Sequence, residues 1–209
     1  MISLDEIRKK ADPGYHMTKD TVSFGHALDG DDVCEKFMES YSIYYNLIRK
    51  DEGESADDAS DADRVTVTEP FFAQAVFDSK GEQYFLIKAA KVAEVDSAEY
   101  VYFARVDELT PEALEPLDKK AWETGISHVN PSVSHKNTDV VLIVIADDIT
   151  PEAVEEVKRA RHSKTYMFAL HGYSNYRLVA IGLNKGEAYF NRQASILRQL
   201  VGNIITRDS

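Results

Sequence analysis

Cysteine is almost absent from this sequence of 209 residues, which contains only Cys34. A single cysteine excludes an internal disulfide and any zinc site built from several cysteines. Cys34 stands beside Val33 and near Phe37 in a pattern typical of an amphipathic helix. We therefore expect a buried or half-buried structural thiol rather than a reactive one.

Long apolar runs are also missing. The longest stretch of uncharged apolar residues is Val140–Ala146, whereas a helix that crosses a bilayer needs about 20 such residues. The first residues, Met1–Glu6, have neither the basic start nor the apolar core of a signal peptide. With 44% hydrophobic and 29% charged residues, the composition is that of a globular protein with a buried core. We predict a cytoplasmic protein that does not contact membranes.

Motifs that specify a reaction are missing as well. Glycines such as Gly81 and Gly125 stand singly, so they form no glycine-rich phosphate loop. The segment 172–176 lacks the second glycine of the nucleophile elbow found in serine hydrolases. His128 and His135 are seven positions apart, which matches no standard zinc pair. We therefore favour binding over catalysis.

Negative charge is in excess, and the excess lies in one half of the chain. The net charge is −12 at pH 7; residues 1–110 contain 24 acidic and 12 basic residues, whereas residues 111–209 contain 12 of each. Seven of the acids fall within 51–63, which has no basic and no large apolar residue. Such a segment gains too little from burial to offset the entropy lost on ordering. We expect a flexible acidic loop over 51–64.

A repeated pattern is the most informative feature that is present. Val101–Glu115 aligns without a gap on Val141–Glu155, forty positions later, and each copy runs from apolar residues through acids to Thr-Pro-Glu-Ala. Threonine accepts a free backbone N–H at a helix start, proline has a helical φ, and glutamate suits the positive end of the helix dipole. Each copy therefore predicts a strand, a short loop and a helix.

The other segments extend this pattern to an α/β (α+β) fold with the order α-βββ-α-β-α-βββ-α. Residues 1–30 predict an irregular N-terminal segment with a short helix near 4–10, and residues 31–209 predict a single domain. The other expected helices are 31–50, 111–125, 151–162 and 193–205, and the expected strands are 70–77, 82–95, 99–106, 140–146, 166–170, 177–183 and 187–190. Right-handed crossovers would make the strands near 100–106, 140–146 and 166–170 parallel. The result is a mixed parallel and antiparallel sheet covered by helices.

Tyrosines recur along the first of these helices at three- and four-residue spacing. Tyr41, Tyr44 and Tyr45 could form a stacking surface for a ligand. A helix face that packs against a sheet has the same spacing and is the favoured interpretation.

Four acids follow the two repeated strands. Because parallel strands end at the same edge of a sheet, these acids would meet where open α/β sheets place their ligands. Carboxylates there could hold Mg²⁺ or Mn²⁺, although acids before a helix start are favoured without any ligand. The residues of this predicted metal site are Asp107, Glu108, Asp147 and Asp148.

A basic stretch follows the second repeat. Residues 158–186 contain six Lys and Arg residues and no acid, and aromatic residues are interleaved with them. Cations and flat rings suit phosphates and unstacked bases, but the same cations could pair with the acidic N-terminal half. The predicted binding residues are Lys158, Arg159, Arg161, His162, Lys164, Tyr173, Tyr176 and Arg177.

Helix, three strands, helix and strand over residues 31–146 is an order similar to the core of the restriction-endonuclease-like nucleases. That family needs an acid on its second strand and an acid-x-Lys on its third. The corresponding segments here read Phe-Leu-Ile-Lys over 85–88 and Tyr-Val-Tyr-Phe-Ala-Arg over 100–105. The resemblance therefore implies a non-catalytic relative.

Together these patterns favour a non-catalytic macromolecule-binding or regulatory domain without a cofactor. A protein partner is the first choice, and nucleic acid bound by 158–186 is a second. The alternative is a divalent-metal-dependent phosphoryl-transfer or nuclease-type enzyme using Asp107, Asp147 and Asp148. A third hypothesis is a regulator whose acidic segment, 51–63, engages a basic partner surface.

Overall fold

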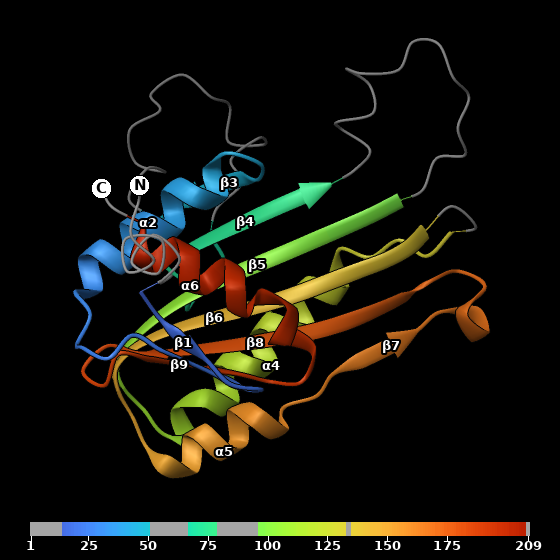
Figure 1. Ribbon diagram of the computed structural model, residues 1–209. Helices are drawn as coiled ribbons and strands as arrows, with labels where there is room; N and C mark the ends of the chain where they lie inside the picture. Colours follow the sequence, from blue (N-terminus) through green and yellow to red (C-terminus); the bar gives the residue numbers. More distant parts are fainter. Residues whose placement is uncertain (1–13, 51–66, 79–95, 133–134, 208–209) are drawn as a thin grey trace, which may run out of the picture.

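The computed structural model describes residues 14–50, 67–78, 96–132 and 135–207. They form one mixed sheet with helices on both faces (Figure 1). The helices are α2 (Gly30–Ser42), α4 (Pro111–Ser127), α5 (Pro151–Arg159) and α6 (Arg198–Thr206). The strands are β1 (His16–Met17), β2 (Thr21–Ser23), β3 (Asn46–Arg49), β4 (Ala73–Asp78), β5 (Asp96–Leu109), β6 (His135–Ile149), β7 (Ser163–Thr165), β8 (Tyr173–Gly182) and β9 (Glu187–Phe190).

Three parallel strands form the middle of the sheet. The strand order is β1-β2-β9-β8-β6-β5-β4-β3, and β7 pairs with β8 outside this order. β6 is parallel to both β5 and β8, whereas the outer pairs are antiparallel. The predicted mixed sheet covered by helices is confirmed.

The two repeated segments are neighbours in register. Val101 pairs with Val141 and Leu109 with Ile149, so the spacing along the sheet equals the spacing along the sequence. Thr110 caps α4 and Thr150 caps α5, each by accepting a hydrogen bond from the backbone N–H three residues later. The predicted equivalence of the two strand–loop–helix units is confirmed.

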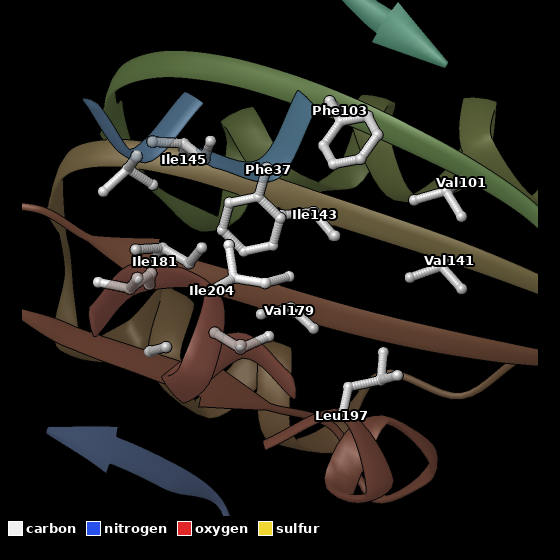
Figure 2. Close-up of a cluster of buried hydrophobic side chains, with 14 of the residues drawn as sticks. Phe37, Val101, Phe103, Val141, Ile143, Ile145, Val179, Ile181, Leu197 and Ile204 are labelled. Carbon is white, nitrogen blue, oxygen red and sulfur yellow. The ribbon is translucent and has the colours of Figure 1, made fainter. Parts of the chain in front are cut away.

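Each face of the sheet has its own apolar core. α2 and α6 cover one face, where Phe37 and Ile204 pack on alternate residues of the central strands (Figure 2). α4 and α5 cover the other face, where Leu114 and Val157 pack on the intervening residues. On β6, for example, Ile143 belongs to the first core and Leu142 to the second, as the alternation of side chains along a strand requires.

The N-terminal half departs from the predicted elements in two places. The helix expected over 31–50 ends at Ser42, and Asn46–Arg49 forms β3 against β4. Ile48 favours a strand over a helix, and pairing with β4 decides the outcome. In addition, β1 and β2 extend the sheet where irregular structure was expected.

A third difference concerns 166–170, where a parallel strand was predicted. This segment contains a 3₁₀ turn, Met167–Ala169, and the third parallel strand is β8 instead. The side chains of Met167, Phe168 and Leu170 are exposed, so their apolar character does not reflect burial. The final helix, expected over 193–205, is a 3₁₀ turn, Gln193–Leu197, followed by α6.

Three expectations concern residues outside the described ranges. They are the short helix near 4–10, the acidic loop over 51–64 and the strand over 82–95.

Candidate functional site

The acids predicted to bind a metal lie at one edge of the sheet but make separate contacts. Glu108 pairs with Asp148 in the β5–β6 register, which confirms the shared edge. The side chain of Asp147 forms an ion pair with Arg105, and that of Asp148 accepts a hydrogen bond from Asn184 (2.8 Å). Among the described residues, no three His, Cys, Asp or Glu side chains are placed to hold a metal ion together. The metal site stays a prediction that this geometry does not favour.

The cations at the end of α5 contact acids of the same protein. Lys158 Nζ lies 3.7 Å from Asp20 Oδ2 and 3.8 Å from Glu155 Oε1. Arg159 contacts both Glu155 and Glu156 of α5. The alternative to nucleic-acid contact, pairing with the acidic N-terminal half, is therefore seen for Lys158, whereas the acids that Arg159 contacts lie in α5 itself. Arg161 and Lys164 are exposed, as is Tyr173.

His162 and Tyr176 belong to a packed cluster beneath α4. His162 Nε2 lies 2.5 Å from Asp118 Oδ2, and its ring stacks on Trp122. Tyr176 is fully buried, and burial followed by the charge of Asp118 raises its pKa well above the ordinary value. A cavity of about 330 Å³ opens beside Asp118 and His162. These side chains tie α4 to the end of α5.

Arg177 lies on the opposite face of the sheet, in a cluster of buried charges. Its guanidinium donates to Asp139 (2.8 Å) and to Glu99 (3.3 Å). The three side chains come from β8, β6 and β5 and are only 14%, 10% and 18% exposed, respectively. Asn137 and Asn175 also donate to Asp139, each at 3.3 Å. The predicted binding residues are thus divided between both faces of the sheet.

A pocket opens above this charge cluster, between α2 and α6. Its volume is about 580 Å³, which is typical of ligand pockets. Glu99 lies among its lining residues, so the charge cluster reaches the pocket. The lining residues are Ser40, Tyr41, Ile43, Tyr44, Tyr45, Phe77, Glu99, Leu200, Asn203, Ile204 and Arg207.

The rim of the pocket is apolar and exposed. Ile43 is 62% exposed, Tyr44 70% and Leu200 45%. Inside, the ring centroids of Tyr41 and Tyr45 are 4.8 Å apart, and those of Tyr45 and Phe77 are 5.7 Å apart. The aromatic surface therefore continues from the buried wall to the rim.

Burial shifts the titration of the polar groups in the pocket. It raises the pKa of Glu99, and the Arg177 guanidinium opposes this shift. Burial, and then the charge of Glu99, also raises the pKa of Tyr45. Burial, and then the charge of Glu99, raises the pKa of Tyr41 as well. The tyrosine hydroxyls therefore stay protonated at neutral pH and act as hydrogen-bond donors.

Glu99 was not among the predicted site residues. Tyr41 packs against the sheet, as favoured, and it also lines the pocket together with Tyr44 and Tyr45. The signal for Glu99 was strand alternation, because Glu99, Val101 and Phe103 share one face. That face is the core beneath α2 and α6.

Cys34 contacts the same core from the side of α2. It is partly buried, and burial raises the pKa of its thiol. This is the environment expected of a structural thiol.

Comparison with known proteins identifies the family to which this chain belongs. No helix among the described residues has the length and apolar character needed to cross a membrane. No curated protein and no solved structure matches the chain. The model of the family described as "Domain of unknown function (DUF8052)" matches residues 29–201, from the N-cap of α2 into α6, and the chain therefore belongs to that family.

Proposed function

We propose that this domain is a non-catalytic binding module that holds a protein partner in the pocket between α2 and α6. The observation that carries the proposal is an apolar pocket of about 580 Å³ whose rim consists of exposed Ile43, Tyr44 and Leu200. Large apolar side chains at the surface of a pocket mark interaction sites. Tyrosine is also among the residues that contribute most to the binding energy of protein interfaces.

A protein partner explains the rim better than a small molecule does. A small ligand is largely enclosed by its pocket, and it would leave the outward parts of Ile43 and Tyr44 in water. A protein segment can place one side chain in the pocket and cover the rim with its neighbours. The extent of the apolar surface beyond the pocket therefore supports a macromolecular partner.

Binding also agrees with the chemistry of the pocket better than catalysis does. The raised pKa values of Tyr41 and Tyr45 keep these hydroxyls protonated at neutral pH, so the phenolate that a general base requires is not populated. The carboxylate of Glu99 accepts a hydrogen bond from Arg177. These groups are suited to orienting a guest.

The proposal includes a cytoplasmic location. Its support is the lone cysteine, because a chain that folds without disulfides needs no oxidising compartment. The thiol of Cys34 is partly buried, with a pKa raised by burial.

Site-specific photo-crosslinking in the source cells tests the proposed interface. A photoreactive phenylalanine analogue replaces Tyr44 at the rim, Phe168 in the exposed 3₁₀ turn, or Glu123 on α4 as a control. Position 44 should yield a discrete protein adduct that positions 168 and 123 do not. Because Leu200 is exposed, Leu200→Glu should leave the melting temperature nearly unchanged and remove the adduct.

Two results would contradict this proposal. An adduct formed from position 168 and not from 44 would place the interface at the 3₁₀ turn. An adduct at 44 that persists in Leu200→Glu would show that the pocket is not the site of contact. Purified adducts, identified by mass spectrometry, distinguish a partner from a second copy of this chain.

A further inference from the structure

The buried charges beneath the pocket do not balance. Glu99 and Asp139 each contribute a carboxylate, and Arg177 contributes one guanidinium. When both acids are ionised, the cluster carries one net negative charge. A buried charge without a partner is unfavourable, and burial indeed raises the pKa of Glu99. Of the two acidic residues, Glu99 belongs to the pocket lining.

Among the described residues, the cations near the pocket are held by other groups. Arg207 lines the pocket, but its guanidinium lies 2.6 Å from Glu39. Lys36 of α2 lies 2.9 Å from Asp32 and also donates to a backbone carbonyl of α6. Among the described residues, only Arg177 pairs with Glu99, and it also pairs with Asp139, so the pocket borders a cluster with one net negative charge when both acids are ionised.

The aromatic lining favours the same kind of guest. Rings of Tyr41, Tyr45 and Phe77 stand next to one another along the pocket, and Tyr44 adds a fourth ring at the rim. The face of an aromatic ring attracts a cation, most strongly where water is excluded. Several rings and one carboxylate together form the recognition chemistry of an organic cation.

We propose that the guest of this pocket carries an ammonium or guanidinium group on an apolar stem. The cation contacts Glu99, and the stem packs along the rings. The cation belongs to a Lys or Arg side chain of the protein partner, and this assignment rests on the proposed function. Ile43 and Leu200 then contact the apolar residues that flank this side chain.

Binding of two matched probes tests the cation. Nα-acetyl-lysine methylamide and Nα-acetyl-norleucine methylamide share an apolar stem, and only the lysine probe carries a side-chain ammonium group. In amide-resolved NMR titrations of the full chain, the lysine probe should bind at least about tenfold more tightly, a difference of about 1.4 kcal/mol. The shifts should centre on α2, Tyr45 and α6.

Charge variants locate the origin of this preference. Glu99→Gln should bind both probes equally, because the carboxylate that distinguishes them is gone. Glu123→Gln removes one negative charge from exposed α4 on the other face of the sheet, and it should keep the preference. Melting temperatures and amide spectra verify that both variants fold.

Three outcomes overturn the inference. They are equal affinities of wild-type protein for the two probes, a lysine preference that survives Glu99→Gln, and no response from the pocket to either probe at millimolar concentration. Any of these leaves the crosslinking result, and hence the proposed function, unaffected.

A third probe detects the case in which the pocket binds a cation but no protein partner. n-Hexylammonium supplies the cation without a peptide backbone. If it binds more tightly than the lysine probe while position 44 yields no protein adduct, the guest is a free alkylamine. The cation inference then holds, and the protein partner is wrong.

Discussion

Glu99 is a residue whose charge is unfavourable for the isolated fold. Its carboxyl is mostly removed from water, and burial raises its pKa above the ordinary value in spite of Arg177. The folded protein therefore binds a proton at Glu99 more tightly than the unfolded chain does. The stability linked to this proton is fully present below the unfolded pKa of a glutamate and is lost as the pH rises through the folded pKa.

Glu99→Gln should accordingly become more favourable as the pH rises. Position 99 of the variant is uncharged at every pH, whereas the wild type buries a carboxylate there as the pH rises through the raised pKa of Glu99. The melting temperature of the variant relative to the wild type should therefore be higher at pH 7 than at pH 4. Differential scanning calorimetry at the two pH values measures this.

Glu123→Gln is the matched control, because Glu123 is exposed on α4. Its melting temperature relative to the wild type should not rise in the same way. If the melting temperature of Glu99→Gln relative to the wild type fell between pH 4 and pH 7, the ion pair with Arg177 would outweigh the burial of the carboxylate.

At the scale of elements, α4 lies against β6 because one helical residue has no side chain. A Cβ atom on Gly125 would stand 2.5 Å from Val140 Cγ2 and 2.7 Å from Val140 Cγ1. Val140 is fully buried in the centre of β6, so it cannot move aside easily. Glycine inside a helix usually costs about 0.5–1 kcal/mol relative to alanine. Here it permits close packing of the helix on the sheet.

Gly125→Ala should therefore destabilise the protein, although alanine is the better helix former. Overpacking in a core costs about 1–3 kcal/mol, which exceeds the gain in helix propensity. Urea denaturation of Gly125→Ala, Val140→Ala and the double variant gives the coupling. The double variant should be more stable than the sum of the single effects predicts, because Val140→Ala removes the clashing methyl groups. An additive result would show that the helix shifts without contact to Val140.

The repeated elements were predictable because local chemistry determines them. Thr110 and Thr150 cap their helices with the same geometry, and the forty-residue spacing of the repeat gives the β5–β6 register directly. The end of α2 was not predictable in this way. β3 exists because Asn46–Arg49 pairs with β4, and tertiary pairing overrides the helical spacing of the tyrosines.

The pocket was less accessible from the sequence than the fold was. Glu99, Asp139 and Arg177 each lie on the core-facing side of a strand, as alternation with Val101, Val141 and Val179 would have indicated. Their meeting, however, depends on the register between β6 and β8. The prediction that 166–170, rather than the strand expected at 177–183, is the third parallel strand removed that register. The pocket also needs α6 beside α2, and no local pattern specifies this contact.

At the scale of the whole molecule, two cores share one sheet. The core beneath α2 and α6 and the core beneath α4 and α5 both use β5, β6 and β8. Loss of packing on one face therefore weakens strands on which the other face depends. We expect the two faces to unfold together.

Ile143→Ala tests this from one face with a probe on the other. Ile143 is fully buried beneath α2 and α6, and its truncation should cost about 2–5 kcal/mol. Trp122, the single tryptophan, packs on the core beneath α4 and α5. Its fluorescence and the far-ultraviolet circular dichroism should shift to the same lower urea midpoint. Separate midpoints would show that the faces unfold independently.

The central position of β6 makes its amides a gauge of binding. β6 is paired on both sides, and from Val140 to Ala146 every residue is fully buried. Backbone N–H groups in such a strand exchange with deuterium only when the sheet opens as a whole. A guest that binds only the folded state raises the free energy of this opening by RT ln(1 + [L]/Kd) and thereby slows the exchange. Protons far from the pocket thereby report its occupancy, and the affinity of any partner can be read from them without a label near the site.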